Sequence, residues 1–370
     1  MRIAQISPLI ESVPPKMYGG TERVVSWLTE ELVKQGHDVT LFASGDSITS
    51  AELVACSDQA LRLDPQCKDT YPHLMMMLDT VRTCAHEFDL VHFHVEFFHL
   101  PFFRQMADRT LTTLHSRQDF NDYALLYKTY NRMPLAAISK SQASAIPMGN
   151  VAGVIYHGLP TNLLKPNLKP KGDYLAFLGR IARDKRPDRA VEIAKAAGIP
   201  LKIAAKVDNA DKAYYDEIRH LLDQPGVEFI GEVNEREKQD FLGNARALLF
   251  PIDWPEPFGL VMIEAMACGT PVLAFRNGSV PEVIDEGVTG HIVGSVEDAV
   301  KMLPRTLELD RRKVRSVFEE RFTVTRMARD YVKLYRKLLA KPAQLETHRI
   351  NGIGAGLVPQ LQVSHEPSRT

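Results

Sequence analysis

The sequence predicts an α/β protein in which two doubly wound domains face a cleft between them. Short runs rich in β-branched residues alternate with amphipathic stretches from residue 2 to residue 139. A segment dense in Pro and Lys follows at 161–173, and the same alternation then begins again. The length of 370 residues also fits two or three domains, at roughly 150 residues each.

The first domain is expected at residues 1–160. Its clearest helix lies between the first two strands, where large apolar residues recur every four positions from Val24 to Leu32. Thr21 is expected to cap the start of this helix and Gly36 to end it. The resulting β-α-β unit predicts a Rossmann-like parallel sheet. The strand-like runs of this domain are 2–7, 38–44, 89–95, 110–115 and 135–139.

The segment 161–173 reads as a linker, and a second Rossmann-like domain is expected at 174–325. An amphipathic helix follows at 326–342, and we expect it to cross back to the first domain. Residues 343–370 show no usable periodicity and are expected to form a mobile tail. The strand-like runs of the second domain are 174–179, 201–206, 227–231, 246–251 and 271–275.

The composition is that of an ordinary soluble globular chain, with 45% hydrophobic and 25% charged residues. A formal net charge of −1 provides no global attraction to nucleic acid or to an anionic membrane. The four cysteines show neither C-x-x-C spacing nor the density of a disulfide scaffold, which fits a reducing compartment. No cleavable leader and no apolar run of membrane-spanning length are present. We therefore expect a cytoplasmic protein.

A glycine pair precedes the first helix. After the first strand a long loop ends in Tyr18, Gly19 and Gly20. Glycines let the backbone approach a ligand, and the start of a helix offers free N–H groups to an anion. A turn that needs only the backbone freedom of glycine explains the same pair. No G-x-G-x-x-G follows this strand and the chain has no Walker A motif, which argues against nicotinamide and P-loop chemistry.

Two basic residues leave the strand 174–179 together, namely Arg180 and Lys185. Ligands of open parallel sheets bind at the carboxyl ends of the strands, so these side chains should face the cleft. A diphosphate clamp would need such a pair, with charge-assisted hydrogen bonds of roughly 1.5–3 kcal/mol each. Ordinary surface charges on a loop are the alternative explanation.

Two acidic residues, Glu256 and Glu264, lie on either side of a predicted helix start. Glu256 precedes the helix and is expected to face the cleft, and Glu264 lies within the helix. Ionised carboxylates only accept hydrogen bonds, which suits the hydroxyl groups of a sugar. Glu264 as an ordinary surface charge is the simpler alternative. Phosphate oxygens or sugar hydroxyls can also reach the free N–H groups at the helix start, around Phe258, Gly259, Leu260 and Val261.

Together these features resemble the retaining glycosyltransferases of family 4, which have the GT-B fold. Residues 256–264 match the E-x7-E motif of that family, and 265–275 and 278–290 match the sequence that follows it. The resemblance covers nearly all of residues 1–340. It implies that Glu256 contacts the donor sugar and that Glu264 contacts the ribose of the nucleotide.

The resemblance also implies roles for the other candidates. Arg180 and Lys185 would hold the diphosphate, and Gly19 and Gly20 would close on it from the first domain. The backbone at Phe258 to Val261 would contact the sugar and the phosphates.

His115 ends the strand-like run 110–115 and falls where the family often carries a histidine near the transferred sugar. A structural role is the commoner one for a single histidine, and His94 is a weaker candidate on the same edge.

The chain departs from the family at Arg186, where a glycine is usual, and at His157-Gly158. Lys206 could add another cation to the donor site.

The function implied by the resemblance is transfer of a hexosyl group from a nucleoside diphosphate sugar, with UDP favoured, to an acceptor hydroxyl. We expect retained anomeric configuration, no cofactor and no metal, since no two aspartates lie two positions apart as in an Asp-x-Asp motif. A role in polysaccharide or glycoconjugate biosynthesis is expected. A non-hydrolysing nucleotide-sugar epimerase and a non-catalytic nucleotide-sugar sensor remain alternatives.

The acceptor is expected to be a carbohydrate or a lipid-linked sugar. The aromatic run 95–103 and the helix 122–132 could face a lipid-linked acceptor or make a weak membrane contact. Packing in the core is the competing explanation for both stretches. No nucleic-acid partner is expected, and the sequence predicts no oligomeric state.

Overall fold

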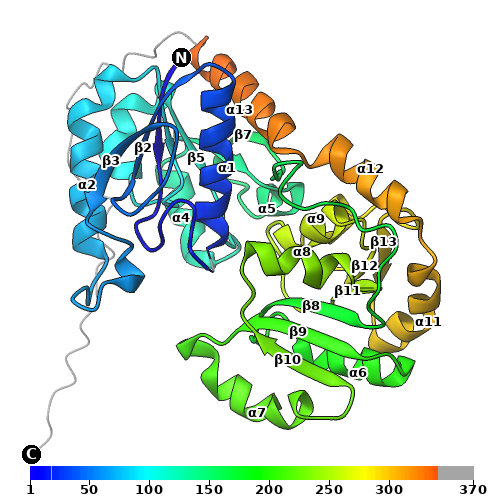
Figure 1. The fold of residues 1–370 in the computed structure, drawn as a ribbon. Coiled ribbons are helices and arrows are strands. Elements are labelled where there is room, and N and C mark those ends of the chain that lie inside the picture. The colour runs from blue at the N-terminus through cyan, green and yellow to red at the C-terminus, as the bar shows by residue number, and fades with distance from the viewer. Residues whose placement is uncertain (18, 341–370) are drawn as a thin grey trace, which may run out of the picture.

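The structure is a computed structural model that describes residues 1–17 and 19–340. The described chain forms two parallel sheets in two domains that lie side by side (Figure 1). The predicted fold class of two doubly wound α/β domains is therefore confirmed. The order of the first sheet is β3-β2-β1-β4-β5-β6-β7. Its strands are β1 (Arg2–Ile6), β2 (Asp38–Ser44), β3 (Glu52–Ser57), β4 (Leu90–Phe93), β5 (Thr110–Thr113), β6 (Pro134–Ala137) and β7 (Asn150–Val154).

The second sheet has the order β10-β9-β8-β11-β12-β13, and its neighbouring strands also pair in parallel. Along the sequence, the strands of the first sheet precede the segment 161–173 that was expected to link the domains, and the strands of the second sheet follow it. The strands of the second sheet are β8 (Leu175–Arg180), β9 (Leu201–Lys206), β10 (Val227–Gly231), β11 (Ala247–Phe250), β12 (Val272–Phe275) and β13 (Gly290–Val293).

Helices pack on both sheets, because crossovers between parallel strands place a helix on one face or the other. The helices of the first domain are α1 (Gly20–Lys34), α2 (Tyr71–Cys84), α3 (Leu100–Phe103), α4 (Asn121–Thr129) and α5 (Lys140–Ser144). Those that follow are α6 (Pro187–Ala197), α7 (Lys212–Leu222), α8 (Glu235–Gly243), α9 (Leu260–Ala267), α10 (Val280–Val283), α11 (Val296–Leu307), α12 (Arg311–Arg321) and α13 (Val324–Leu339).

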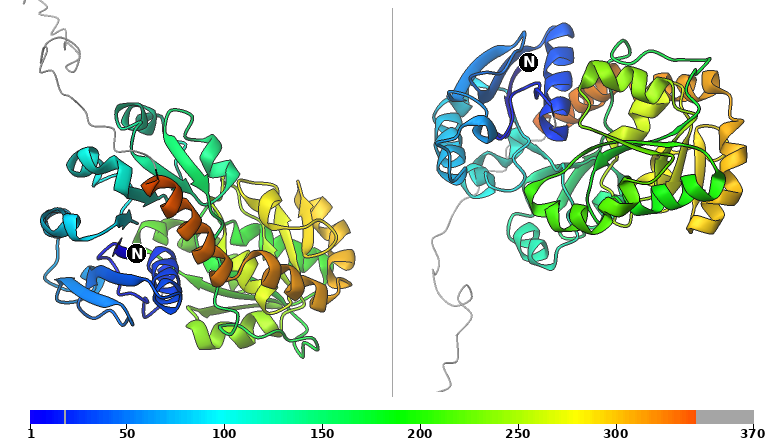
Figure 2. Two further views of the ribbon diagram at one scale, coloured as in Figure 1. Left: turned by 90° about the horizontal axis from the view of Figure 1, so that it is seen from above. Right: turned by 60° about the horizontal axis from the view of Figure 1, so that its bottom comes forward.

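Helix α13 returns to the first domain, as expected for the last amphipathic helix. Thr323 caps it by accepting a hydrogen bond from the backbone N–H of Arg326. The helix then runs along α1 (Figure 2). Tyr331 and Tyr335 are fully buried, and their hydroxyl groups reach side chains of the first sheet. A single buried cluster therefore runs through both domains.

Helix α12 holds the connecting segment in place. Arg315 is nearly buried and its guanidinium donates hydrogen bonds to the backbone carbonyls of Thr161 and Leu164. Arg311 donates from Nε to the carbonyl of Asn167 at 2.7 Å. The first half of the segment between the sheets is thus bound to the helix that precedes α13.

The strands that the sequence did not reveal are β3, β7 and β13, and each lies at an edge of its sheet. Central strands of a parallel sheet are buried on both faces and form apolar runs. The three missed strands contain polar or small residues instead, whereas the edge strand β10 was predicted. The expected cap of α1 was wrong as well. The helix begins at Gly20, with Gly19 rather than Thr21 at the N-cap.

The expected mobile tail at 343–370 lies outside the described residues. Within residues 1–17 and 19–340, no helix has both the length and the hydropathy that crossing a membrane requires.

Candidate functional site

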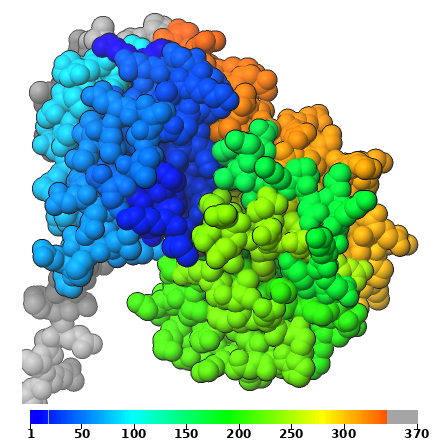
Figure 3. Space-filling model, in the orientation of Figure 1, coloured from blue at the N-terminus to red at the C-terminus, as the bar shows by residue number. Residues whose placement is uncertain are grey.

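A cavity of about 450 Å³ lies between the two domains, where the carboxyl ends of both sheets meet. Figure 3 shows the surfaces of the first domain (blue) and of the second (yellow-green) meeting along this boundary. Side chains and backbone from both domains line the cavity. The lining includes every residue predicted for the site, namely Gly19, Gly20, His115, Arg180, Lys185, Lys206, Glu256, Phe258, Gly259, Leu260, Val261 and Glu264.

The glycine pair faces the start of α9 across the cavity. A Cβ atom on Gly20 would lie 3.9 Å from Cδ1 of Leu260, so the two domains approach closely here. A Cβ atom on Gly19 would lie 2.7 Å from Cβ of Pro15, which leaves no room for a side chain. Glycine at position 19 is therefore required by packing, and the start of α1 opens directly onto the cavity.

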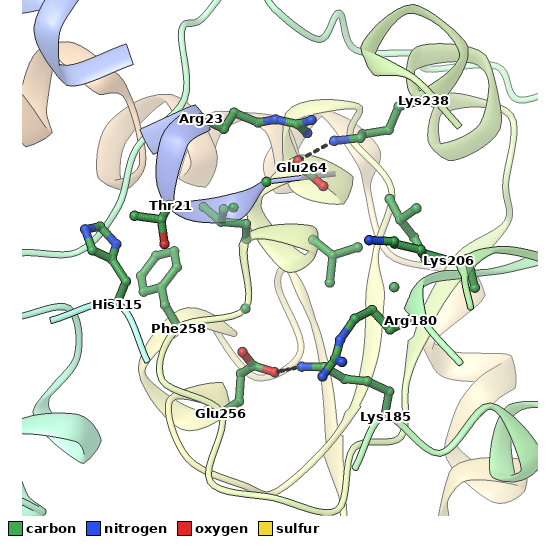
Figure 4. Close-up of a pocket in the computed structure, with 18 of the residues that line it drawn as sticks. Thr21, Arg23, His115, Arg180, Lys185, Lys206, Lys238, Glu256, Phe258 and Glu264 are labelled. Atoms are coloured by element: carbon green, nitrogen blue, oxygen red, sulfur yellow. Dashed lines mark hydrogen bonds and ion pairs between the residues drawn. The ribbon is translucent and has the colours of Figure 1, made fainter. Parts of the chain in front are cut away.

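Lys185 and Glu256 form an ion pair on the wall formed by the second domain (Figure 4). The Nζ atom of Lys185 lies 2.5 Å from Oε2 of Glu256, and the indole N–H of Trp254 donates to the same oxygen at 3.0 Å. The ammonium group also lies 4.2 Å from the centre of the Trp254 ring. No motif or spacing in the sequence had pointed to Trp254. Together these contacts fix the carboxylate of Glu256 at the edge of the cavity.

Glu264 is held by a lysine that sequence reasoning missed. Gly259 has a φ of +80° and forms the N-cap of α9, which brings Glu264 onto the cavity wall. Nζ of Lys238, on α8, lies 2.7 Å from Oε1 of Glu264 and 2.7 Å from Oε1 of Glu235. Glu235 in turn pairs with Arg23 of α1, so this chain of charges joins the two domains.

Nothing in the sequence could have singled out Lys238, because it stands in the charged stretch 234–240 of an ordinary surface helix. Its role depends on the angle at which α8 packs against α9.

The basic residues at the ends of β8 and β9 are paired with acidic neighbours. Arg180 lies 3.0 Å from Asp211 and 3.5 Å from Asp208, and Lys206 lies 2.7 Å from Asp208. Burial disfavours the charged form of Asp208, but the hydrogen bond and charge of Lys206 and the charge of Arg180 outweigh it, and the pKa of Asp208 is lowered. Both cations are thus held in one orientation beside the cavity.

His115 lines the cavity from the first domain. Its Nε2 atom lies 2.8 Å from Nδ1 of His94, and its ring stacks on His157 with centroids 5.4 Å apart. Its backbone N–H donates to Glu96 at 3.0 Å. Burial lowers the pKa of His115 to about 3, so the ring is neutral at physiological pH. His94 is buried behind it.

Models of two known families match the two domains of the chain. The model described as Glycosyltransferase Family 4 matches residues 18–155, and the model described as Glycosyl transferases group 1 matches residues 161–321. The chain belongs to the family 4 glycosyltransferases, with the GT-B fold.

Solved structures of this fold align with almost the whole chain. AviGT4, a glycosyltransferase involved in avilamycin A biosynthesis, is 25% identical and aligns over 92% of this chain and 99% of its own, with a TM-score of 0.70. Sucrose-phosphate synthase from Thermosynechococcus elongatus is 21% identical over 92% of this chain and 99% of its own, with a TM-score of 0.73. Anabaena Alr3699/HepE in complex with UDP-glucose is 17% identical over 91% and 100% of the two chains, with a TM-score of 0.69.

The curated relatives are similar over a shorter stretch. A D-inositol 3-phosphate glycosyltransferase of Mycobacterium leprae (strain Br4923) is 29% identical over 209 residues, which are 52% of this chain and 48% of that protein. The enzyme of the same description from Mycobacterium marinum is 30% identical over 154 residues, or 38% and 33% of the two chains. The matches therefore span a third to a half of the length of these relatives.

Within the part of the chain that the structure describes, no three His, Cys, Asp or Glu side chains are grouped so as to hold a metal ion.

Proposed function

We propose that the protein transfers a hexosyl group from a nucleoside diphosphate sugar to an acceptor hydroxyl, with retention of anomeric configuration. The observation that carries this proposal is that positively and negatively charged side chains occupy different parts of one cavity. Cations lie at the ends of β8 and β9, and the carboxylates of Glu256 and Glu264 lie on either side of the α9 start. A nucleoside diphosphate sugar has anionic phosphates between two groups rich in hydroxyls, which matches this order.

The diphosphate would lie against Arg180 and Lys185, with the N–H groups at the start of α9 and the loop of Gly19 and Gly20 completing its surroundings. Lys206 would add a third cation. These groups are already held in place by neighbouring residues, so they need little reorganisation when charge develops on the leaving group. Such fixed charges are worth more in a closed cavity than in bulk water.

In the proposed reaction the bond between the anomeric carbon and the phosphate oxygen breaks on the face where the acceptor attacks. A bond forms between that carbon and the acceptor oxygen, and the proton of the acceptor hydroxyl moves to an oxygen of the departing diphosphate. Glu256 orients the sugar by accepting hydrogen bonds from its hydroxyls. In this reaction the acceptor oxygen attacks the anomeric carbon directly, so Glu256 positions the sugar and is not a nucleophile, while Lys185 and Trp254 hold its Oε2 atom. Glu264 would accept from the ribose.

UDP sugars are the first donors to test, because Anabaena HepE, which shares the fold, was solved with UDP-glucose. The acceptor class proposed is a carbohydrate or a lipid-linked sugar in polysaccharide or glycoconjugate biosynthesis. A cytoplasmic location is proposed on the four cysteines, which form no disulfide. No organic cofactor is invoked.

The test is incubation of the protein with a panel of UDP, GDP and ADP hexoses, followed by product analysis by NMR. Slow release of nucleoside diphosphate with the α-hexose supports a retaining transferase. Formation of an epimeric nucleotide sugar would identify an epimerase, and binding without any product would identify a sensor. Either of these two results contradicts the proposal.

The proposed mechanism also needs no divalent metal, since fixed cations take its place. Activity is expected to survive exhaustive treatment with EDTA and to change less than about twofold on addition of magnesium or manganese. Loss of nearly all activity with EDTA, restored by either ion, would contradict the assignment of the cations.

A further inference from the structure

A chain of buried hydrogen bonds connects His115 at the cavity to the last helix of the protein. Nε2 of His115 lies 2.8 Å from Nδ1 of His94, and Nε2 of His94 lies 2.8 Å from Oε1 of Gln5. The amide nitrogen of Gln5 faces the hydroxyl of Tyr335 on α13 at 3.4 Å. That hydroxyl lies 2.8 Å from Nδ1 of His92. The chain thus crosses β1, β4 and α13.

The direction of each hydrogen bond follows from the orientation of the Gln5 amide, whose oxygen faces His94 and whose nitrogen faces Tyr335. A carbonyl oxygen only accepts, so Nε2 of His94 must carry a proton. A neutral imidazole has a single N–H, and burial lowers the pKa of His94 well below its usual value. Nδ1 of His94 therefore has a lone pair, and Nε2 of His115 must donate to it. The remaining nitrogen of His115, Nδ1, is then unprotonated.

The hydrogen bonds on the α13 side of Gln5 are consistent with this direction. The amide N–H of Gln5 donates to the oxygen of Tyr335, whose own proton is then given to Nδ1 of His92. Nε2 of His92 is left to donate to the hydroxyl of Thr113, at 2.7 Å. Each of these groups is buried, so reversing one bond would leave buried donors or acceptors unpaired.

The lone pair of His115 is available to a ligand. Among the residues that the structure describes, none forms a hydrogen bond to Nδ1 of His115, and this atom is not sealed from solvent. The ring lies at the cavity near Thr21 and Phe258 (Figure 4). A ligand group that forms a hydrogen bond with Nδ1 of His115 must therefore be the donor.

We propose that Tyr335 of the crossing helix, acting through Gln5 and His94, holds His115 as a neutral ring with its proton on Nε2, so that Nδ1 accepts a hydrogen bond from a hydroxyl of the bound sugar. This inference rests on the proposed function. It names the substrate class as a hexose with a hydroxyl at the position facing His115. A uronic acid would place a carboxylate against the lone pair and should bind at least about tenfold more weakly.

The first test needs no substrate. The full chain is labelled with ¹⁵N-histidine and the ring nitrogens are observed by two-bond ¹H–¹⁵N correlation at pH 7, with His115→Gln used for assignment. We expect a neutral His115 protonated on Nε2. A ring protonated on Nδ1, or a charged ring, would overturn the proposal. Absence of transfer activity with the expected tautomer would contradict the proposed function alone.

A matched pair of variants tests the role of Tyr335. Tyr335→Phe leaves the amide of Gln5 without its acceptor, so Gln5 can turn and His115 should show both tautomers. Tyr331→Phe removes an equally buried hydroxyl one turn earlier on α13, but this hydroxyl contacts Thr113 rather than Gln5. It should leave the His115 signals unchanged. Equal effects of the two variants, or no effect of Tyr335→Phe, would overturn the proposal.

Discussion

The ammonium nitrogen of Lys185 lies 2.5 Å from the carboxylate oxygen Oε2 of Glu256, although 71 positions separate the two residues in the chain. Their side chains are only 15% and 10% exposed. The two are assigned to different parts of the ligand, Lys185 to the diphosphate and Glu256 to the sugar. The ion pair therefore marks the point at which the sugar and the diphosphate would join, and it orients both side chains before any ligand binds.

Gly278 packs against the backbone of Glu256. It has a φ of +55°, and a Cβ atom there would lie 2.3 Å from both the backbone nitrogen and the backbone oxygen of Glu256. We expect Gly278→Ala to displace the loop of Glu256, to lower turnover at least about tenfold and to destabilise the fold by roughly 1–3 kcal/mol. Turnover and thermal unfolding are the measurements.

Gly287→Ala is the control for this change, because Gly287 has a φ of +73° but no atom within 4 Å of the position of its Cβ. This variant should carry a similar backbone strain while turnover stays near that of the wild type. If the two alanine variants had the same turnover, the close approach to Glu256 would not matter.

Arg23 and Glu235 connect the two domains next to the cavity. Arg23 also donates to the carbonyl of Met17 at 2.7 Å, which fixes its orientation. Because this pair joins α1 to α8, we expect Arg23→Ala to widen the cleft and to increase the radius of gyration of the unliganded protein. A bound nucleoside diphosphate should reduce the radius again in both proteins. Small-angle X-ray scattering measures both changes.

Lys34→Ala serves as the comparison, since Lys34 is an exposed residue at the other end of α1 and pairs with Glu31 of the same helix. Its scattering profile should match that of the wild type. Identical profiles for Arg23→Ala and Lys34→Ala, with and without nucleotide, would count against a cleft that closes on the donor.

Glu22 makes the stability of the protein depend on pH. Burial raises its pKa to about 7 from a usual value of 4.5, and the charge of Glu11 adds to the shift. The folded protein therefore holds this proton more tightly than the unfolded chain. The stabilisation from Glu22 is complete below about pH 4.5 and is lost as the pH rises through 7, by roughly 3 kcal/mol in total.

Glu22→Gln removes this titration while keeping an oxygen that accepts hydrogen bonds. We expect the wild type to lose stability relative to the variant between pH 5 and pH 8, as measured by urea unfolding at several pH values. A difference in unfolding free energy that stays constant with pH would show that Glu22 is charged throughout.

The sequence contained enough to predict the residues at the ends of central strands. Arg180, Lys185 and Glu256 follow apolar runs, and the carboxyl ends of parallel strands meet at one edge by geometry alone. His115 also ends a strand-like run, but it was selected because the resembled family often carries a histidine there. Each of these residues lines the cavity, and their chemical roles remain predictions.

The partners of these residues could not be predicted in the same way. Lys238 meets Glu264 because α8 and α9 pack together, and Tyr335 meets Gln5 because the last helix returns to the first strand. Such contacts depend on the packing of whole elements, and no local pattern or spacing records them. Three of the four edge strands, β3, β7 and β13, were missed because their polar and small residues interrupt the apolar pattern, whereas the edge strand β10 was predicted.

The most direct test of the donor site is isothermal titration of UDP, GDP and ADP into four proteins: the wild type, Lys185→Ala, Glu256→Gln and the double variant. With the diphosphate on Lys185, Lys185→Ala should weaken the preferred nucleotide roughly tenfold to a hundredfold. Glu256→Gln should bind it as well as the wild type or better, because Lys185 then loses its competing partner. The double variant should recover part of the loss, because no unpaired carboxylate then faces the phosphates. Unchanged affinity for all three nucleotides in Lys185→Ala would contradict the account.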